Sequence, residues 1–150
     1  MEFIDNITEE LYKYRPSLTK RDDFDEFWER TISESKAVPL ESESILYDYP
    51  SPFVEVYDIT YNGFDGTLIH GWYMCPKFID RSNLPCIVHY HGYGGNRGRP
   101  ADFMQWVMMG FAVISIDCRD QNGDTGNRAI YSSGSTQSVV CKGIRDKDES

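Results

Sequence analysis

Hydrophobic and polar positions follow a helical period in the first part of the chain. The sequence predicts a first helix that begins near Thr8, a capping side chain followed by acidic residues, and ends at Pro16. A second helix is predicted over residues 22–36. The side chains spaced along one of its faces are apolar, namely Phe24, Phe27, Trp28 and Ile32. We expect this stripe to pack against another part of the protein.

After Pro39 the pattern changes to that of β-strands. Strands rich in β-branched and aromatic residues are predicted over residues 45–49, 54–61 and 67–75. The turn sequence Asn62-Gly63-Phe64-Asp65-Gly66 separates the last two of these strands. It therefore predicts that they form an antiparallel hairpin.

The next stretch has the pattern of a parallel sheet. Residues 85–90 and 111–117 are short, almost wholly apolar runs, which are typical of strands buried on both faces. Between them lies a helical run over residues 101–109, which Gly110 is expected to end. A strand, a loop, a helix and a second strand of this length predict a crossover between parallel strands. The predicted fold class is therefore α/β.

Composition restricts the function classes further. The 150 residues are 40% hydrophobic and 26% charged, as in one globular domain. A net charge of -9 without a basic stripe argues against nucleic acid and against anionic membranes as partners. We find no signal peptide and no apolar run of roughly 20 residues, so we expect a cytoplasmic protein. Without C-x-x-C spacing the cysteines are expected to be reduced, buried thiols: Cys75, Cys86, Cys118 and Cys141.

The stretch His91-Gly92-Tyr93-Gly94-Gly95 follows a predicted buried strand and is the most informative motif. In serine esterases with the α/β-hydrolase fold, the loop after the third strand supplies a backbone N–H to the oxyanion hole. Glycines permit the sharp bend and the close approach of a ligand that such a loop needs. A plain glycine turn between a strand and a helix would explain the same residues, so both interpretations stay open.

A dinucleotide-binding site and a metal site are two further interpretations of the same segment. Dinucleotide binding would need a third glycine where Arg97 stands, although Asp117 follows at a suggestive distance for the acidic residue of such sites. His89 and His91 point to one side of a strand and would need a third ligand to bind a metal, for which only His70 remains among the histidines. We favour structural roles for these histidines and expect no metal and no cofactor.

Seven segments carry a resemblance to a known family: Leu11-Tyr12-Lys13-Tyr14-Arg15-Pro16, Asp22-Asp23-Phe24-Asp25-Glu26-Phe27-Trp28, the hairpin segments Tyr57-Asp58-Ile59-Thr60-Tyr61 and Ile69-His70-Gly71-Trp72-Tyr73, His91-Gly92-Tyr93, Asp117-Cys118-Arg119-Asp120-Gln121, and Lys142-Gly143-Ile144. In this order they resemble the N-terminal half of the cephalosporin-C deacetylase / acetyl xylan esterase family. The resemblance covers nearly the whole chain.

The resemblance implies an intracellular α/β-hydrolase that forms a homo-oligomer. It implies removal of acetyl groups from short xylo-oligosaccharides and from cephalosporin C. The backbone N–H of Tyr93 would be one oxyanion donor and would contact the substrate, with His91 and Gly92 shaping its loop. Arg119 and Gln121 would organise the neighbouring loop, and we expect Arg119 to pair with carboxylates.

The resemblance also implies that residues 1–150 form a single, incomplete α/β-hydrolase domain. Its parts would be a helical N-terminal extension (1–40), a β-hairpin region (41–80) and the start of the parallel sheet with the oxyanion loop (81–150). Asp120 stands where the family usually has glycine and Asn122 where a small residue is common. Asp and Asn tolerate the left-handed backbone conformation better than most residues.

These residues contain no nucleophile of the expected kind. No serine has glycine two positions before and two positions after it, as in G-x-S-x-G, and Ser135, which directly follows Gly134, also fails this match. His70, His89 and His91 all precede the place of a nucleophile, whereas the triad order in this fold is Ser, Asp, His. We therefore expect this chain to be inactive alone, and we expect the strand at 86–90 to be an exposed apolar edge that makes it poorly soluble or partnered.

Three hypotheses about function follow. We favour the N-terminal part of a carbohydrate acetyl esterase that uses a serine mechanism on an acetylated oligosaccharide or another small acetyl ester. The alternative is a non-catalytic interaction subunit or truncated pseudoenzyme. A nucleotide-binding module is the third.

Overall fold

A computed structural model describes residues 2–129 of the chain. Ser135, Cys141 and the segment Lys142-Gly143-Ile144, on which part of the sequence interpretation rests, lie outside the described residues. The chain divides into two compact units, Met1–Ser33 and Glu34–Ser150. The expected division of one incomplete domain at residues 40 and 80 stays a prediction.

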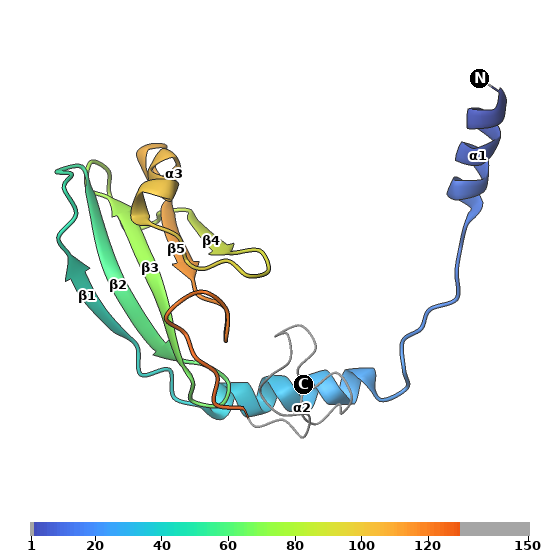
Figure 1. Cartoon of the computed structure of the whole chain (residues 1–150), viewed down its shortest axis with the longest axis horizontal. Helices are drawn as coiled ribbons and strands as arrows, with labels where there is room; N and C mark the ends of the chain where they lie inside the picture. The colour runs from blue at the N-terminus through green and yellow to red at the C-terminus, as the bar shows by residue number, and fades with distance from the viewer. Residues whose placement is uncertain (1, 130–150) are drawn as a thin grey trace. The chain divides into compact units, whose positions relative to one another are not determined.

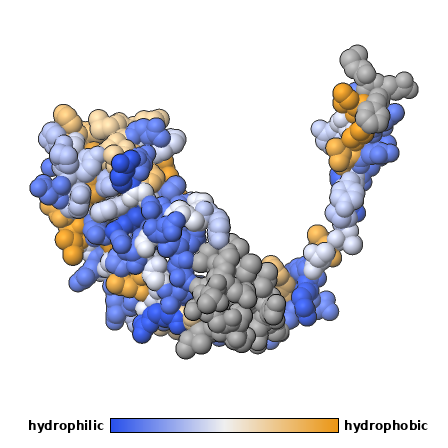
Figure 2. Space-filling model, viewed as in Figure 1, coloured by the Kyte–Doolittle hydropathy of each residue, from blue (hydrophilic) through white to orange (hydrophobic). Residues whose placement is uncertain are grey.

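The first helix, α1, spans Glu2–Lys13 and therefore begins earlier than its sequence predicts. Thr8 lies inside the helix, where its hydroxyl donates a hydrogen bond to the carbonyl of Ile4, so the expected cap at Thr8 is wrong. The helix ends before Pro16, as expected. Ile4 and Leu11 are exposed, and hydrophobic surface shows on α1 in Figure 2.

The second helix, α2, spans Phe24–Ala37, close to the predicted range. No residue of α2 is buried in the described structure, so the expected packing of its apolar stripe is not found there. Phe24 and Trp28 instead contact each other edge to face at 6.3 Å between ring centroids, and Phe27 contacts Trp28 in the same way at 5.5 Å.

Five strands form one sheet in the order β1-β2-β3-β5-β4 (Figure 1). Their bounds are Glu43–Tyr47 for β1, Val54–Asn62 for β2, Leu68–Pro76 for β3, Cys86–Tyr90 for β4 and Ala112–Ile116 for β5. The antiparallel pairing of β2 with β3 confirms the predicted hairpin, and β3 also pairs antiparallel with β5. The parallel pairing of β4 with β5 confirms the predicted crossover and, with the helices, the α/β class.

A short 3₁₀ helix, η1 (Pro100–Phe103), runs into α3 (Met104–Met108) within the crossover. These turns pack on one face of the sheet, and the residues that form the common core come from both: Val54, Val56, Met74, Phe103, Val107 and Val113. Gly110 has φ of +95° directly after the helical turns, which confirms its predicted role as their end.

The strand β4 contradicts one prediction and confirms another, since it is an exposed apolar edge of the described sheet, as expected for residues 86–90. Its burial alternates, with Cys86, Val88 and Tyr90 exposed, so it is not buried on both faces. The reason is its place at the edge of the described sheet, where β5 is its one partner. Cys75 is buried as predicted, but Cys118 is only partly buried and Cys86 is exposed, so the expected burial is wrong for Cys86. All three described cysteines are free thiols.

Among residues 2–129, no helix has both the length and the apolar character that crossing a membrane requires.

Glu55 on β2 supplies a test of the hairpin's electrostatics. Hydrogen bonds from Arg81 and Tyr57, each 2.7 Å long, lower the pKa of Glu55 from 4.5 to about 2. Because the folded-state pKa is the lower one, this carboxylate stabilises the fold at neutral pH and loses that contribution as the pH falls from 4.5 to about 2.

We expect Arg81→Ala to raise the pKa of Glu55 toward its ordinary value in an NMR titration of the carboxyl group. The loss of stability at neutral pH should be small, since the side chain of Arg81 is 40% exposed and water screens the pair. Arg99→Ala, which removes a distant exposed arginine, is the control. An unchanged Glu55 titration in Arg81→Ala would show that Arg81 is not the cause.

Candidate functional site

Two loops meet at one edge of the sheet. The glycine loop (residues 91–96) follows β4, and the β5 loop (residues 117–125) follows β5. Because β4 and β5 are parallel neighbours, with Tyr90 opposite Ile116, both loops leave the sheet at the same end. The carboxyl ends of parallel strands are where α/β proteins place their ligands.

Hydrogen bonds join the two loops directly. The backbone N–H of Gly94 donates to Oε1 of Gln121 at 2.7 Å, and Nδ2 of Asn122 donates to the carbonyl of Gly94 at 2.6 Å. The backbone N–H of Asn122 donates to the carbonyl of Gly95 at 3.2 Å. Gln121, a predicted site residue, and Asn122, which the sequence marked only as a departure, thus hold the glycine loop in place.

His91 joins the same two loops through its ring. The backbone N–H of Cys118 donates to its Nε2 at 2.9 Å, so Nδ1 carries the proton and donates to the carbonyl of Gly92 at 2.8 Å. Both ring nitrogens are therefore engaged. In residues 2–129 no three His, Cys, Asp or Glu side chains gather in a way that would hold a metal ion.

Tyr93 lies in a tight turn that the hydrogen bond from the N–H of Gly95 to the carbonyl of Gly92 closes at 2.9 Å. Its side chain is largely exposed, at 68% of the residue surface. Gly94, the next residue, has φ of +72°, a conformation that side-chain-bearing residues rarely adopt. The N–H groups of Gly94 and Gly95 are both used within these loops, which fixes the backbone on the C-terminal side of Tyr93.

Arg119 ties the β5 loop to the turn of the hairpin. Its Nη2 lies 2.9 Å from Oδ1 of Asp65, which is the carboxylate pairing that the sequence predicts. Burial raises the pKa of Asp65, but hydrogen bonds from Thr67 and the charge of Arg119 outweigh it, so the pKa lies below its ordinary value. Asp120 has φ of +53°, as expected for a residue in place of glycine.

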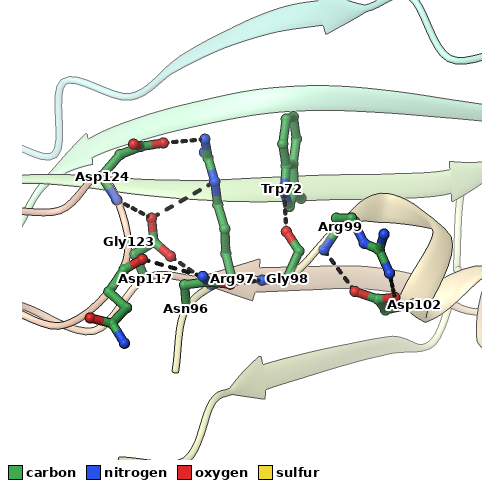
Figure 3. A pocket seen from close by; sticks show the side chains of 10 residues that line it. Trp72, Asn96, Arg97, Gly98, Arg99, Asp102, Asp117, Gly123 and Asp124 are labelled. Carbon is green, nitrogen blue, oxygen red and sulfur yellow. Dashed lines mark hydrogen bonds and ion pairs between the residues drawn. The ribbon is translucent and has the colours of Figure 1, made fainter. Parts of the chain in front are cut away.

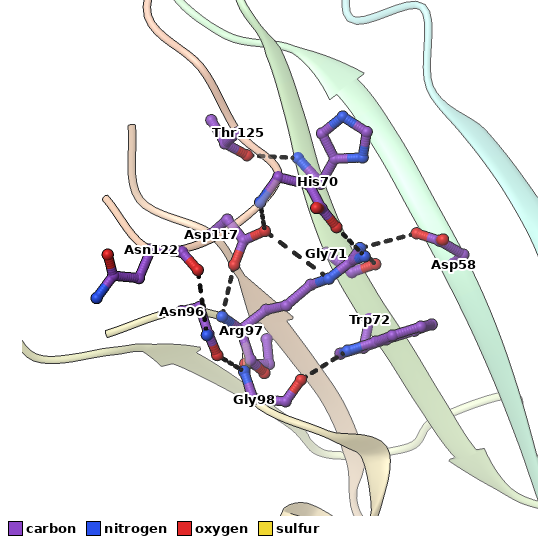
Figure 4. Close-up of polar contacts among 12 residues, drawn as sticks. Asp58, His70, Gly71, Trp72, Asn96, Arg97, Gly98, Asp117, Asn122 and Thr125 are labelled. Atoms are coloured by element: carbon purple, nitrogen blue, oxygen red, sulfur yellow. Dashed lines mark hydrogen bonds and ion pairs between the residues drawn. The ribbon is translucent and has the colours of Figure 1, made fainter. Parts of the chain in front are cut away.

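The sequence pattern does not mark Arg97 as a site residue, although its side chain contacts several segments in this region. Arg97 follows the glycine loop, and its side chain is only 11% exposed. The guanidinium binds Asp58 of β2 at 2.8 Å and Asp124 of the β5 loop at 2.7 Å, and it lies over the ring of Trp72 at 4.3 Å (Figure 4). In the sequence, Arg97 is notable only because it stands where a dinucleotide-binding motif would have its third glycine.

The carboxylate of Asp117 accepts hydrogen bonds from two backbone N–H groups, one on each side of it in the sequence. Its carboxylate is buried and accepts the N–H of Arg97 and, at 2.8 Å, the N–H of Asp124. The backbone of Gly123 packs directly against this carboxyl group. Together with Arg97, these residues line an open pocket of about 470 Å³ (Figure 3), and Trp72 and Asn122 also belong to its lining.

The signal for this cluster was present in the sequence but was not specific. An acidic residue directly after an apolar strand, as at Asp117, is an unusual place for charge, whereas an arginine after a glycine loop is ordinary. Only the sheet order, which sets β3 beside β5, brings Asp58 and Trp72 to them. The arrangement as a whole is a hydrogen-bonded loop of backbone amides at a strand end, next to the buried charges of Arg97 and Asp117.

Gly123 provides a test of this packing. We expect Gly123→Ala to lower the free energy of unfolding by about 1–3 kcal/mol, because a Cβ there would overlap the carboxyl group of Asp117. Gly126→Ala in the same segment is the matched control, since no atom lies within 4 Å of its Cβ position. Thermal unfolding followed by circular dichroism measures both. Equal unfolding temperatures would contradict the contact.

Comparison with known proteins fits this architecture. The family model of acetyl xylan esterase (AXE1) matches residues 1–150. The acetyl xylan esterase from Paenibacillus sp. R4 is 43% identical, with a TM-score of 0.86 over 94% of this chain and 45% of that chain.

Acetyl xylan esterase 1 from Thermoanaerobacterium sp. JW/SL YS485 is 27% identical, with a TM-score of 0.83 over 94% of this chain and 44% of that one. The chain therefore spans a little under half the length of these solved structures. The fold is that of acetyl xylan esterases and is compatible with the predicted N-terminal portion of an α/β-hydrolase. Because the family model matches the chain over its whole length, the chain belongs to the acetyl xylan esterase family.

Proposed function

We propose that these residues form the oxyanion-loop portion of a serine-type carbohydrate acetyl esterase, in which the backbone N–H of Tyr93 is one oxyanion donor. The observation that carries the proposal is the glycine loop after β4, held by Gln121, Asn122 and His91 at the end of parallel strands. An oxyanion donor stabilises the developing charge only if it is fixed before the reaction. The contacts on the backbone of Gly94 and Gly95 provide that rigidity.

Family membership supports the substrate class. Solved structures that resemble the chain are named acetyl xylan esterases, which supports acetylated xylo-oligosaccharides and other small acetyl esters as the proposed substrates. Cephalosporin C is included among them on the sequence resemblance alone. We further propose that the enzyme is cytoplasmic and works as a homo-oligomer. These last points rest on the sequence resemblance.

The nucleophile is the part of the mechanism that these residues lack. A serine esterase needs a serine in a G-x-S-x-G turn, and the N–H after that serine gives the second oxyanion donor. No such motif occurs in the 150 residues. The role proposed for this segment is therefore to bind and polarise the ester carbonyl, while the attacking group comes from outside it.

We expect the purified 150-residue chain to hydrolyse p-nitrophenyl acetate no faster than Tyr93→Pro of the same chain, since neither has a nucleophile. A spectrophotometric assay of p-nitrophenol release checks this. Saturable turnover by the unmodified chain would contradict the proposed division of roles.

Replacing the matching segment of the Paenibacillus sp. R4 esterase by residues 1–150 restores a complete fold around the glycine loop. In this chimera we expect Tyr93→Pro, which removes the N–H, to lower kcat about 10²- to 10³-fold on acetylated xylo-oligosaccharides. Tyr93→Phe keeps the N–H and should keep kcat within about 3-fold.

Circular dichroism of each variant shows whether the chimera is folded. A folded Tyr93→Pro chimera with unchanged kcat would overturn the assignment of Tyr93. A folded, unmodified chimera without activity would overturn the proposed function itself.

A non-catalytic interaction subunit is the second candidate, and one observation favours it. The apolar side chains of Val88 and Tyr90 are exposed on the edge strand β4, which carries no charged residue to discourage pairing. Analytical ultracentrifugation of the 150-residue chain tests this candidate, which requires a defined assembly larger than a monomer.

A further inference from the structure

Arg97 forms ion pairs with three carboxylates of the described structure, and the proposed function gives it no role. We define the Arg97 cluster as Arg97 with the carboxylates of Asp58, Asp117 and Asp124. Asp58 belongs to β2, whereas Asp117 and Asp124 lie near the two ends of the β5 loop. One cation therefore faces three anions and joins a strand of the hairpin to both ends of the β5 loop.

The side chain of Arg97 is placed by geometry that only a guanidinium provides. Nη1 donates to Oδ1 of Asp58 at 2.8 Å and to the carbonyl of Gly71 at 3.2 Å, while Nη2 donates to Oδ2 of Asp124 at 2.7 Å. The planar group lies over the ring of Trp72, and the indole N–H donates to the carbonyl of Gly98 at 3.0 Å. A lysine would keep the charge but would lose this planar fork.

The main chain of Arg97 is held as firmly as its side chain. Its N–H donates to Asp117 (Figure 4), and its carbonyl accepts a hydrogen bond from the hydroxyl of Ser115 at 2.8 Å. His89 of β4 contacts the same hydroxyl at 2.9 Å. The residue at which the chain leaves the glycine loop is thus fixed to β4 and β5 at once.

We propose that Arg97 is a positioning residue for the glycine loop, acting on the oxyanion donor through the β5 loop. The proposal rests on the proposed function. Arg97 holds Asp124, and Asp117 holds the N–H of Asp124 and of Arg97. Gln121 and Asn122, which bind Gly94 and Gly95, lie on the short stretch between those two aspartates.

The consequence of losing the guanidinium follows from charge. Without Arg97 the carboxylates of Asp58, Asp117 and Asp124 would face one another without their shared cation, and Asp117 is buried. The exposed end of the β5 loop, with the Asp124 side chain at 67% exposure, is the part free to move away. Its movement would shift Gln121 and Asn122, and with them the backbone next to Tyr93.

Amide hydrogen exchange on the 150-residue chain tests whether Arg97 holds the glycine loop in place, and this measurement needs no enzymatic activity. We expect Arg97→Met to speed exchange at the amides of Gly94 and Gly95 at least about 10-fold, while amides of the β2–β3 ladder such as Val56 keep their rates. The matched control is Arg99→Met, which removes a neighbouring arginine that is 84% exposed and, within residues 2–129, pairs with Asp102 alone. Unchanged exchange at Gly94 and Gly95 in Arg97→Met would overturn the proposal.

Asp124→Asn keeps the proposal testable if Arg97→Met fails to fold. It removes one exposed charge from the cluster and leaves Asp117 and Arg97 in place, so the sheet should stay intact. We expect it to speed exchange at the same two glycines by a smaller factor than Arg97→Met. No change in Asp124→Asn would then overturn the route through the β5 loop.

Kinetics in the chimera separate positioning from mere stability. A donor displaced by about 1 Å costs about 100-fold, so Arg97→Met should lower kcat by that order and leave KM within about 3-fold. Arg97→Lys should recover part of kcat, and Arg99→Met should keep both constants. A change in KM alone, or full activity in folded Arg97→Met, contradicts the proposal.

The two proposals fail in different ways. If Tyr93→Pro is harmless in an active chimera, the oxyanion assignment fails, yet hydrogen exchange still decides whether Arg97 braces the loop. If Tyr93→Pro lowers kcat and Arg97→Met does not, only the role of Arg97 is refuted.

Discussion

A buried carboxylate at the end of β5 organises this part of the molecule. Asp117 lies where two loops leave the sheet, and it accepts the backbone N–H of Arg97, directly after the glycine loop, and that of Asp124 in the β5 loop. A charge in that position is costly unless it is fully hydrogen-bonded and faces a cation. The close packing of Gly123 and the nearby guanidinium of Arg97 meet those requirements. The conformation of both loops is therefore tied to the need to satisfy one anion.

The order of the strands places residues of other segments around Asp117. β5 lies between β3 and β4, so its C-terminal end is within reach of the hairpin on one side and of the glycine loop on the other. Arg97 and Arg119 use this position to bind carboxylates of the hairpin, Asp58 and Asp65. The glycine loop is consequently braced against the antiparallel half of the sheet as well as against its parallel neighbour.

Local features of the fold could be predicted from the sequence, whereas features that depend on distant partners could not. The hairpin turn, the end at Gly110 and the tolerance of Asp120 for a positive φ all depend on a few adjacent residues, and the structure confirms them. The cap expected at Thr8 failed because an equally helical stretch precedes it. The burial expected for β4 and the cluster around Arg97 depend on strand order, which hydrophobic periodicity does not encode.

Strand order also sets the sequence of events while the chain is being synthesised. The hairpin of β2 and β3 joins neighbouring residues and can form as soon as both have left the ribosome. β4 emerges next but does not pair with β3, because β5 occupies that position in the finished sheet. Its apolar residues must therefore remain without a strand partner until residues 112–116 have been translated. During that interval the nascent chain exposes Ile87 and Val88, and a chaperone that binds short apolar segments would find its target there.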